Sequence, residues 1–182
     1  MNLEQYSVVL SVALVLLLAA TLISIFGFIF SKKAREKLKS LDYFLYIKLI
    51  GVFSIVATVG ALVYQFVYKT PVCEYCWWQR IFMFPIDFIV VGTLWSKVKM
   101  NEYIIGALAV VGGLFAAVHY YFHYQVAILD NILSLPCSSL GIIPSCTETP
   151  VLIWGFITIP LMALVVFLVI LWLVFLARYS DR

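Results

Sequence analysis

The stretch Ser7–Phe30, SVVLSVALVLLLAATLISIFGFIF, contains 24 residues and no charged side chain. A helix of about 20 apolar residues spans the hydrocarbon core of a bilayer, so this stretch is predicted to be a transmembrane helix. A cleaved signal peptide would have a basic start and a shorter apolar run. Here Glu4 is the one charged side chain before the run. We therefore expect the segment to be retained as a span.

The composition of the whole chain agrees with a membrane protein. The 182 residues are 65% hydrophobic and only 12% charged, which leaves too little polar surface for a soluble domain of this size. The further apolar segments are about Tyr43–Tyr68, Trp77–Ser96, Tyr103–Tyr124 and Val151–Ala177. They are too long for membrane strands and lack a two-residue alternation. The sequence predicts an all-α integral membrane protein with five spans.

The basic residues predict the orientation of these spans. Five lie in the linker Ser31–Ser40, and the others on that side are Lys97, Lys99, Arg178 and Arg182. With five spans all nine fall on one side of the membrane, which is then cytoplasmic by the positive-inside rule. The N-terminus is expected outside and the C-terminus inside. The linker is interpreted as a topology anchor, and no nucleic-acid binding is expected.

All four cysteines lie in the two segments predicted to face outward: Cys73, Cys76, Cys137 and Cys146. Disulfides persist outside the cytoplasm and are reduced within it. The first two form a C-x-x-C pair, which closes an easily exchanged disulfide, and the other two have eight residues between them. Two pairs that can approach each other indicate an electron relay by thiol–disulfide exchange.

Two other uses of the cysteines were weighed. Structural disulfides would staple the outer loops, but a C-x-x-C bridge closes almost no loop and gains little stability by doing so. A zinc site favours two closely spaced pairs, and the spacing of the second pair is too wide. No metal is therefore expected.

The stretch Cys73–Arg80, CEYCWWQR, resembles the signature of the disulfide-bond formation protein B (DsbB) family, in particular its BdbC-like branch. Met83–Pro85, Ser145–Thr147 and Gly155–Pro160 are also similar to that branch. The resemblance covers about Leu41–Ala177. It implies a four-helix transmembrane bundle, so the first span is an addition.

This resemblance divides the chain into two parts. Residues 1–40 would be an extra N-terminal transmembrane helix with a basic cytoplasmic linker. Residues 41–182 would be the DsbB-like four-helix redox domain. The sequence assigns no role to the extra helix.

The resemblance also implies a function. Family members reoxidise a DsbA-like thiol oxidase of thioredoxin fold outside the cytoplasm and pass the electrons to a membrane quinone, ubiquinone or menaquinone. Carried onto this chain, Cys137 would form the mixed disulfide with the partner. Cys146 would then attack Cys73, leaving Cys76 to face the quinone. The protein would be a multi-pass plasma-membrane protein with its redox loops on the extracytoplasmic face.

Three further side chains are candidates for the quinone site. Arg80 follows Cys76 by four residues and so shares its helix face. A guanidinium at that depth is costly and marks a functional site, although snorkelling to headgroups would also explain it. We expect it to stabilise the Cys76 thiolate and to polarise a quinone carbonyl. His119 and His123 lie one turn apart, and the resemblance implies that one of them serves the quinone; packing is the alternative for both.

The third apolar segment holds an acidic residue, Asp87, near its middle. It could be a hydrogen-bonded packing residue or part of a proton route, and the sequence leaves both open. Pro85 and Pro160 are predicted to kink their helices, as proline does within membrane spans.

Two competing functions were considered. A relative of vitamin K epoxide reductase would do similar chemistry, but in that family the loop pair precedes the C-x-x-C, whereas here Cys73 and Cys76 come first. A non-catalytic membrane subunit would use its disulfides only to stiffen the outer loops. Resistance of both pairs to a thioredoxin-like dithiol would distinguish that case.

Overall fold

The protein is all-helical in its computed structural model, which describes residues 2–99, 102–127, 129 and 151–181. The helices are α1 (Leu3–Phe30), α2 (Lys32–Lys39), α3 (Tyr43–Phe66), α4 (Glu74–Ser96), α5 (Glu102–Ala127) and α6 (Ile159–Ser180). Over these ranges the one β-type pairing is an isolated bridge between Ile153 and Ile157. The predicted all-α class is confirmed.

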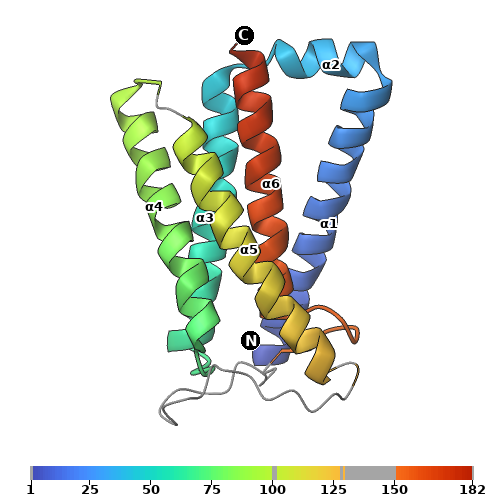
Figure 1. The fold of residues 1–182 in the computed structure, drawn as a ribbon, viewed down its shortest axis with the longest axis vertical. Coiled ribbons are helices and arrows are strands. Elements are labelled where there is room, and N and C mark those ends of the chain that lie inside the picture. Colours follow the sequence, from blue (N-terminus) through green and yellow to red (C-terminus); the bar gives the residue numbers. More distant parts are fainter. Residues whose placement is uncertain (1, 100–101, 128, 130–150, 182) are drawn as a thin grey trace.

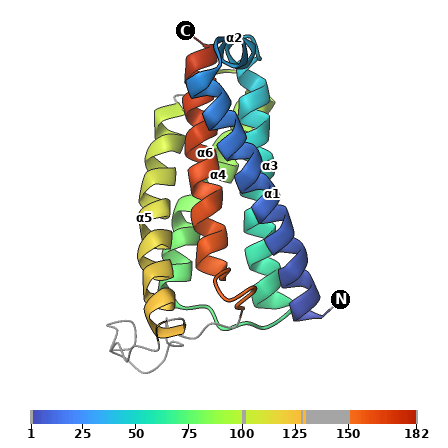
Figure 2. The same ribbon diagram turned by 90° about the vertical axis from the view of Figure 1, so that its right-hand side faces the viewer.

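Four of the helices form a bundle. α3 packs on α4, α4 on α5, α5 on α6, and α6 on α3, which closes the ring (Figures 1 and 2). α1 lies outside this ring against α6, and α2 runs across one end of the molecule to join α1 to α3 (Figure 1). The predicted four-helix bundle with an additional N-terminal helix is therefore what the chain forms.

Among the described helices, α1, α3, α5 and α6 are long and apolar enough to cross a membrane. α4 has 23 residues but carries Glu74, Arg80 and Asp87, and it is not one of these four. α4 nevertheless runs between the same two ends of the bundle as its neighbours (Figure 1). Its membrane crossing, as the predicted fifth span, and the orientation in the membrane stay predictions.

The bundle interior is closely packed. Phe167 of α6 is fully buried, and a Cβ placed on Gly112 would lie 2.4 Å from its ring. α5 and α6 can therefore approach closely only because position 112 has no side chain. The outer helix α1 differs, since its buried residues are only Ser7, Ser11 and Leu14. Most of its apolar surface faces outward, as expected for a helix in lipid.

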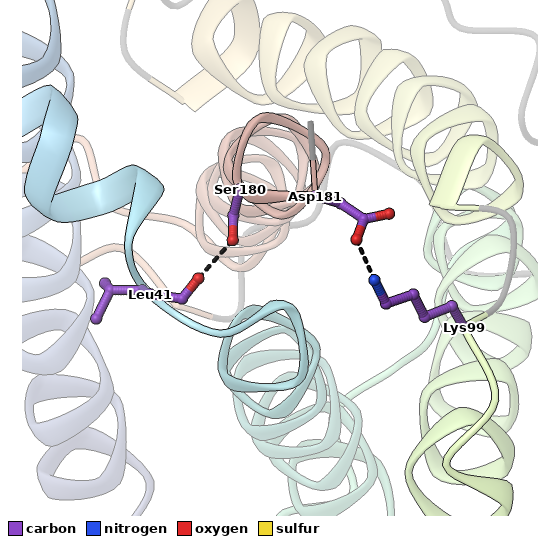
Figure 3. A network of polar contacts seen from close by, with 4 residues as sticks. All are labelled: Leu41, Lys99, Ser180 and Asp181. Carbon is purple, nitrogen blue, oxygen red and sulfur yellow. Dashed lines mark hydrogen bonds and ion pairs between the residues drawn. The ribbon is translucent and has the colours of Figure 1, made fainter.

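The basic end of the bundle is held by polar contacts (Figure 3). Ser180 at the end of α6 donates to the carbonyl oxygen of Leu41, just before α3. Lys99, after α4, forms an ion pair with Asp181. The basic helix α2 lies at this same end, whereas α4 begins at the opposite one (Figure 1). The lysines of α2 and the Cys73–Cys76 pair are thus separated by the length of the bundle.

The last helix begins later than the sequence predicts. The apolar segment starts near Val151, but α6 starts at Ile159 because Trp154 and Gly155 have φ angles of 50° and 77°. Those left-handed conformations form a tight turn, which helical backbone cannot include. Pro160 occupies the first turn of α6, where its missing N–H is not needed. The predicted kink at Pro160 is therefore wrong: the proline starts the helix.

Candidate functional site

The C-x-x-C pair lies at the N-terminus of α4. Cys73 is the N-cap residue, in extended conformation with φ −81° and ψ 171°, and Cys76 lies in the first turn. Their Sγ atoms are 3.4 Å apart, so the pair is a hydrogen-bonded dithiol. Cys73 is 6% exposed, whereas Cys76 is half-buried. The unsatisfied N–H groups of a helix N-terminus favour thiolates, which are the reactive form of cysteine.

One side of the pair contacts α5. The Cys73 Sγ lies 3.3 Å from His119 Nε2, and the Nδ1 of that ring lies 3.0 Å from the Gln79 Nε2. Gln79 therefore donates to Nδ1, which places the proton of a neutral imidazole on Nε2, facing the sulfur. The ring of Tyr75 stacks on His119 with centroids 5.5 Å apart. Gln79, His119 and Cys73 form a continuous hydrogen-bonded chain, all of it buried.

The other side of the pair opens on an apolar cavity of about 300 Å³. α4 lines it with Cys76, Gln79, Arg80, Met83 and Phe84, and the rest of its wall comes from α1, α3, α6 and the segment before Cys73. Neither His119 nor His123 is among the described residues that line it. The prediction that one histidine serves a quinone stays untested, and among the contacts of His119 is the one to Cys73.

Arg80 is held rigidly at the cavity. It is 8% exposed, its Nη2 donates to the Ala61 carbonyl at 3.1 Å, and its Nη1 donates to the Gln65 side chain. Its guanidinium lies over the Trp77 ring, 5.3 Å from the centroid. These partners are uncharged, so they do not neutralise the guanidinium.

Two amide side chains matter more than the sequence indicated. Gln79 was noted only as part of a motif, and Gln65 was not singled out. Each is an uncharged polar residue within or at the end of an apolar run, and such residues in membrane helices usually mark polar networks. That position in an apolar run is the signal that could have identified Gln65.

Asp87 is linked to the cavity wall. Its Oδ2 accepts a hydrogen bond of 2.6 Å from Thr58, which lines the cavity. Its Oδ1 is buried and has no hydrogen-bond partner among the described residues. Packing and proton transfer both remain open for this carboxyl.

Cys137 and Cys146 lie outside the described residues. The donor atoms of Cys73, Cys76 and His119 lie within 4.8 Å of one another, compact enough to hold a metal ion. The expectation of no metal therefore also stays a prediction.

Comparison with known proteins identifies the family. The model of the disulfide bond formation protein DsbB family matches residues 45–177. The chain belongs to the DsbB family. The predicted resemblance is thus confirmed, and the match excludes both α1 and α2.

Relatives in the DsbB family come from several bacteria. Disulfide bond formation protein C of Bacillus subtilis is 31% identical over 121 residues, covering 66% of this chain and 83% of that protein. A probable disulfide formation protein of Oceanobacillus iheyensis is 33% identical over 139 residues, covering 76% of this chain and 89% of that protein. One from Coxiella burnetii is 29% identical over 129 residues, with 70% and 83% covered. No solved structure matches the chain.

Proposed function

We propose that the chain is a membrane thiol–disulfide oxidoreductase that reoxidises a DsbA-like, thioredoxin-fold thiol oxidase and passes the electrons to a membrane quinone. Membership of the DsbB family supports the oxidase activity. The names of the relatives, disulfide bond formation protein C and probable disulfide formation protein, support the same reaction. The redox domain would be residues 41–182, at the plasma membrane with the cysteines on the extracytoplasmic face.

One observation carries this proposal: the two sulfurs of one dithiol face different surroundings. Cys73 contacts His119 on the α5 side, whereas Cys76 lines the apolar cavity beside Arg80. A disulfide between them can therefore receive electrons at one sulfur and deliver them at the other. A purely structural disulfide needs neither a buried histidine at one sulfur nor a cavity at the other.

The cavity fits the ring of a quinone. Its volume of about 300 Å³ is at the lower end of the range of small-molecule sites. Its wall is mostly apolar, and the Arg80 guanidinium and Gln79 amide offer the donors that a carbonyl oxygen needs. A bound quinone would accept two electrons and two protons. Arg80 would orient its carbonyl and favour the Cys76 thiolate.

The second cysteine pair would supply the electrons. The partner's thiolate attacks Cys137, which breaks the Cys137–Cys146 bond and forms a mixed disulfide. The released Cys146 thiolate attacks Cys73, which breaks the Cys73–Cys76 bond and leaves Cys76 as the thiolate at the cavity. A second partner thiolate then resolves the mixed disulfide, which leaves the partner oxidised and releases the Cys137 thiolate. Cys137 attacks Cys146, which breaks the Cys73–Cys146 bond, re-forms the Cys137–Cys146 disulfide and leaves Cys73 and Cys76 as the dithiol that the quinone would reoxidise. This order rests on the family resemblance and agrees with the placement of Cys73 and Cys76.

The direct test uses the full chain in detergent with a reduced thioredoxin-fold dithiol protein and a short-chain quinone. We expect one disulfide formed in the partner for each quinone reduced, with catalytic turnover. Titration of the thiols at defined redox potential provides the second measurement. If both cysteine pairs resist reduction by the partner, the disulfides are structural and the proposal fails.

A second prediction concerns His119. Replacing it by phenylalanine removes the Nε2–H group that faces Cys73, so a thiolate at this sulfur loses a hydrogen-bond donor that stabilises it. We expect the rate of Cys73–Cys76 exchange with the partner at neutral pH to fall by about 100-fold, the lower part of the range for acid–base groups. Stopped-flow exchange measured from neutral to alkaline pH would check this.

The control for His119→Phe is a change in the residue that orients the ring. Gln79→Leu should give a smaller loss in the same direction, because the histidine remains but its tautomer is no longer fixed. Raising the pH should largely restore both variants, since hydroxide then removes the thiol proton. Unchanged exchange in His119→Phe would assign the histidine to packing.

A further inference from the structure

The outer helix α1 contributes a whole face to the cavity. Leu10, Ala13, Leu14 and Leu17 recur at the spacing of one helical face and all line it. The other lining residues come from α3, α4, with Arg80 among them, α6 and the segment before Cys73. α1 is therefore part of the cavity, although it lies outside the matched DsbB region.

α1 is fastened to the bundle at both sides of this face. Near its start, Tyr64 of α3 donates to the Ser7 hydroxyl at 3.0 Å, and Tyr6 donates to the Gly60 carbonyl at 3.4 Å. Near its end, Trp172 of α6 donates to the Ser24 hydroxyl at 3.1 Å. These side-chain hydrogen bonds bracket the four cavity residues, where the contact is apolar.

Part of the cavity wall is also exposed at the molecular surface, on α1 as well as on α3. Ala13 lines the cavity and is also exposed, whereas Leu14 next to it is buried. In a membrane protein, the surface around the middle of an apolar helix faces lipid. A ligand that is dissolved in the bilayer would meet α1 before it met Cys76.

We propose that α1 is the lipid-side wall of the quinone site, with Leu10, Ala13, Leu14 and Leu17 as quinone-binding residues. This inference rests on the proposed function and gives the additional helix a role in it. The bundle supplies the sulfurs and Arg80, and α1 closes the remaining side and so determines how tightly the quinone is retained. In the proposed relay the loop cysteines exchange with Cys73, which contacts α5 through His119, so we expect this exchange not to depend on α1.

The test is Ala13→Trp in the full chain, which places a large side chain in the cavity without touching the cysteines. We expect the quinone retained on purification, and the thermal shift produced by added short-chain quinone, to fall by about tenfold or more, because the ring's space is filled. The rate of thiol exchange with the partner, measured without quinone, should stay at the wild-type value. Ala19→Trp is the matched control, since Ala19 is exposed on the far face of α1.

A second variant guards against misfolding of the first. Leu14→Ala shortens a buried side chain of the cavity wall, whereas Ala13→Trp enlarges one. The Leu14→Ala protein should release bound quinone about tenfold faster than the wild type. If both Ala13→Trp and Leu14→Ala retain quinone as the wild type does, and thiol exchange is intact, the role of α1 is overturned and the proposed function is not. Absence of quinone binding and reduction in the wild-type protein would overturn the proposed function instead.

Discussion

Cys76→Ser is expected to abolish quinone-dependent oxidation of the partner, with a loss of roughly 10⁴-fold or more, comparable to the loss of a nucleophile in other covalent catalysts. A serine hydroxyl cannot form a disulfide with Cys73, so no sulfur remains at the cavity. Cys73 keeps its contact with His119 and can still bond to a loop cysteine. We therefore expect a stable Cys73 mixed disulfide, detectable by non-reducing mass spectrometry, together with zero quinone reduction.

The reverse variant and a control complete this test. Cys73→Ser should also stop turnover, but it leaves the second pair as an internal disulfide, because Cys146 has no sulfur to attack. Ser96→Ala changes one small polar side chain at the other end of α4 and should turn over as the wild type does. Full turnover by Cys76→Ser would contradict the relay.

Arg80→Met is expected to lower kcat/KM for the quinone by about 100-fold, because a charged hydrogen bond contributes about 1.5–3 kcal/mol. Methionine fills much of the same volume but removes the charge beside Cys76 and the donor facing the cavity. Arg80→Lys keeps the positive charge but loses the planar guanidinium group. Its kcat/KM for the quinone should lie between the values of the wild type and Arg80→Met. Quinone reduction at saturating partner concentration measures the effect.

A matched arginine lies at the other end of the bundle. Arg178 lies over the Tyr103 ring at 4.0 Å, as Arg80 lies over Trp77 at 5.3 Å. Arg178→Met therefore controls for the loss of one arginine–aromatic contact far from the sulfurs. Equal quinone kinetics in Arg80→Met and Arg178→Met would mean that Arg80 is an interfacial anchor, as the snorkelling interpretation holds.

The helices were predictable because lipid imposes a strong constraint on sequence. A span needs a long apolar run, so α1, α3 and α5 begin and end within a few residues of their segments. The start of α6 was missed because the turn at Trp154–Gly155 is as apolar as the helix, and hydropathy cannot distinguish the two. In α4 the opposite happens: the helix forms, but the polar residues that belong to the candidate site lower its mean hydropathy.

The site was only partly predictable. Cys73, Cys76 and Arg80 are close together in the sequence, so helical periodicity correctly predicts their arrangement along one helix. The contact between His119 and Cys73 joins α5 to α4, and no pattern within either segment specifies how two helices are rotated against each other. For the same reason, nothing in Ser7–Phe30 indicates that one face of α1 lines a cavity.

The burial of Cys73 has a consequence for the cell as a whole. With 6% of its surface exposed, this sulfur is poorly accessible to dissolved small thiols; in the proposed relay, a cysteine of the chain's own loop is the group that reaches it. Cys76 lies beyond it, on the cavity side. In the proposed relay, the burial of Cys73 would keep small thiols outside the membrane from reducing the dithiol directly, so electrons would reach the quinone only from a partner that has first exchanged with the loop cysteines.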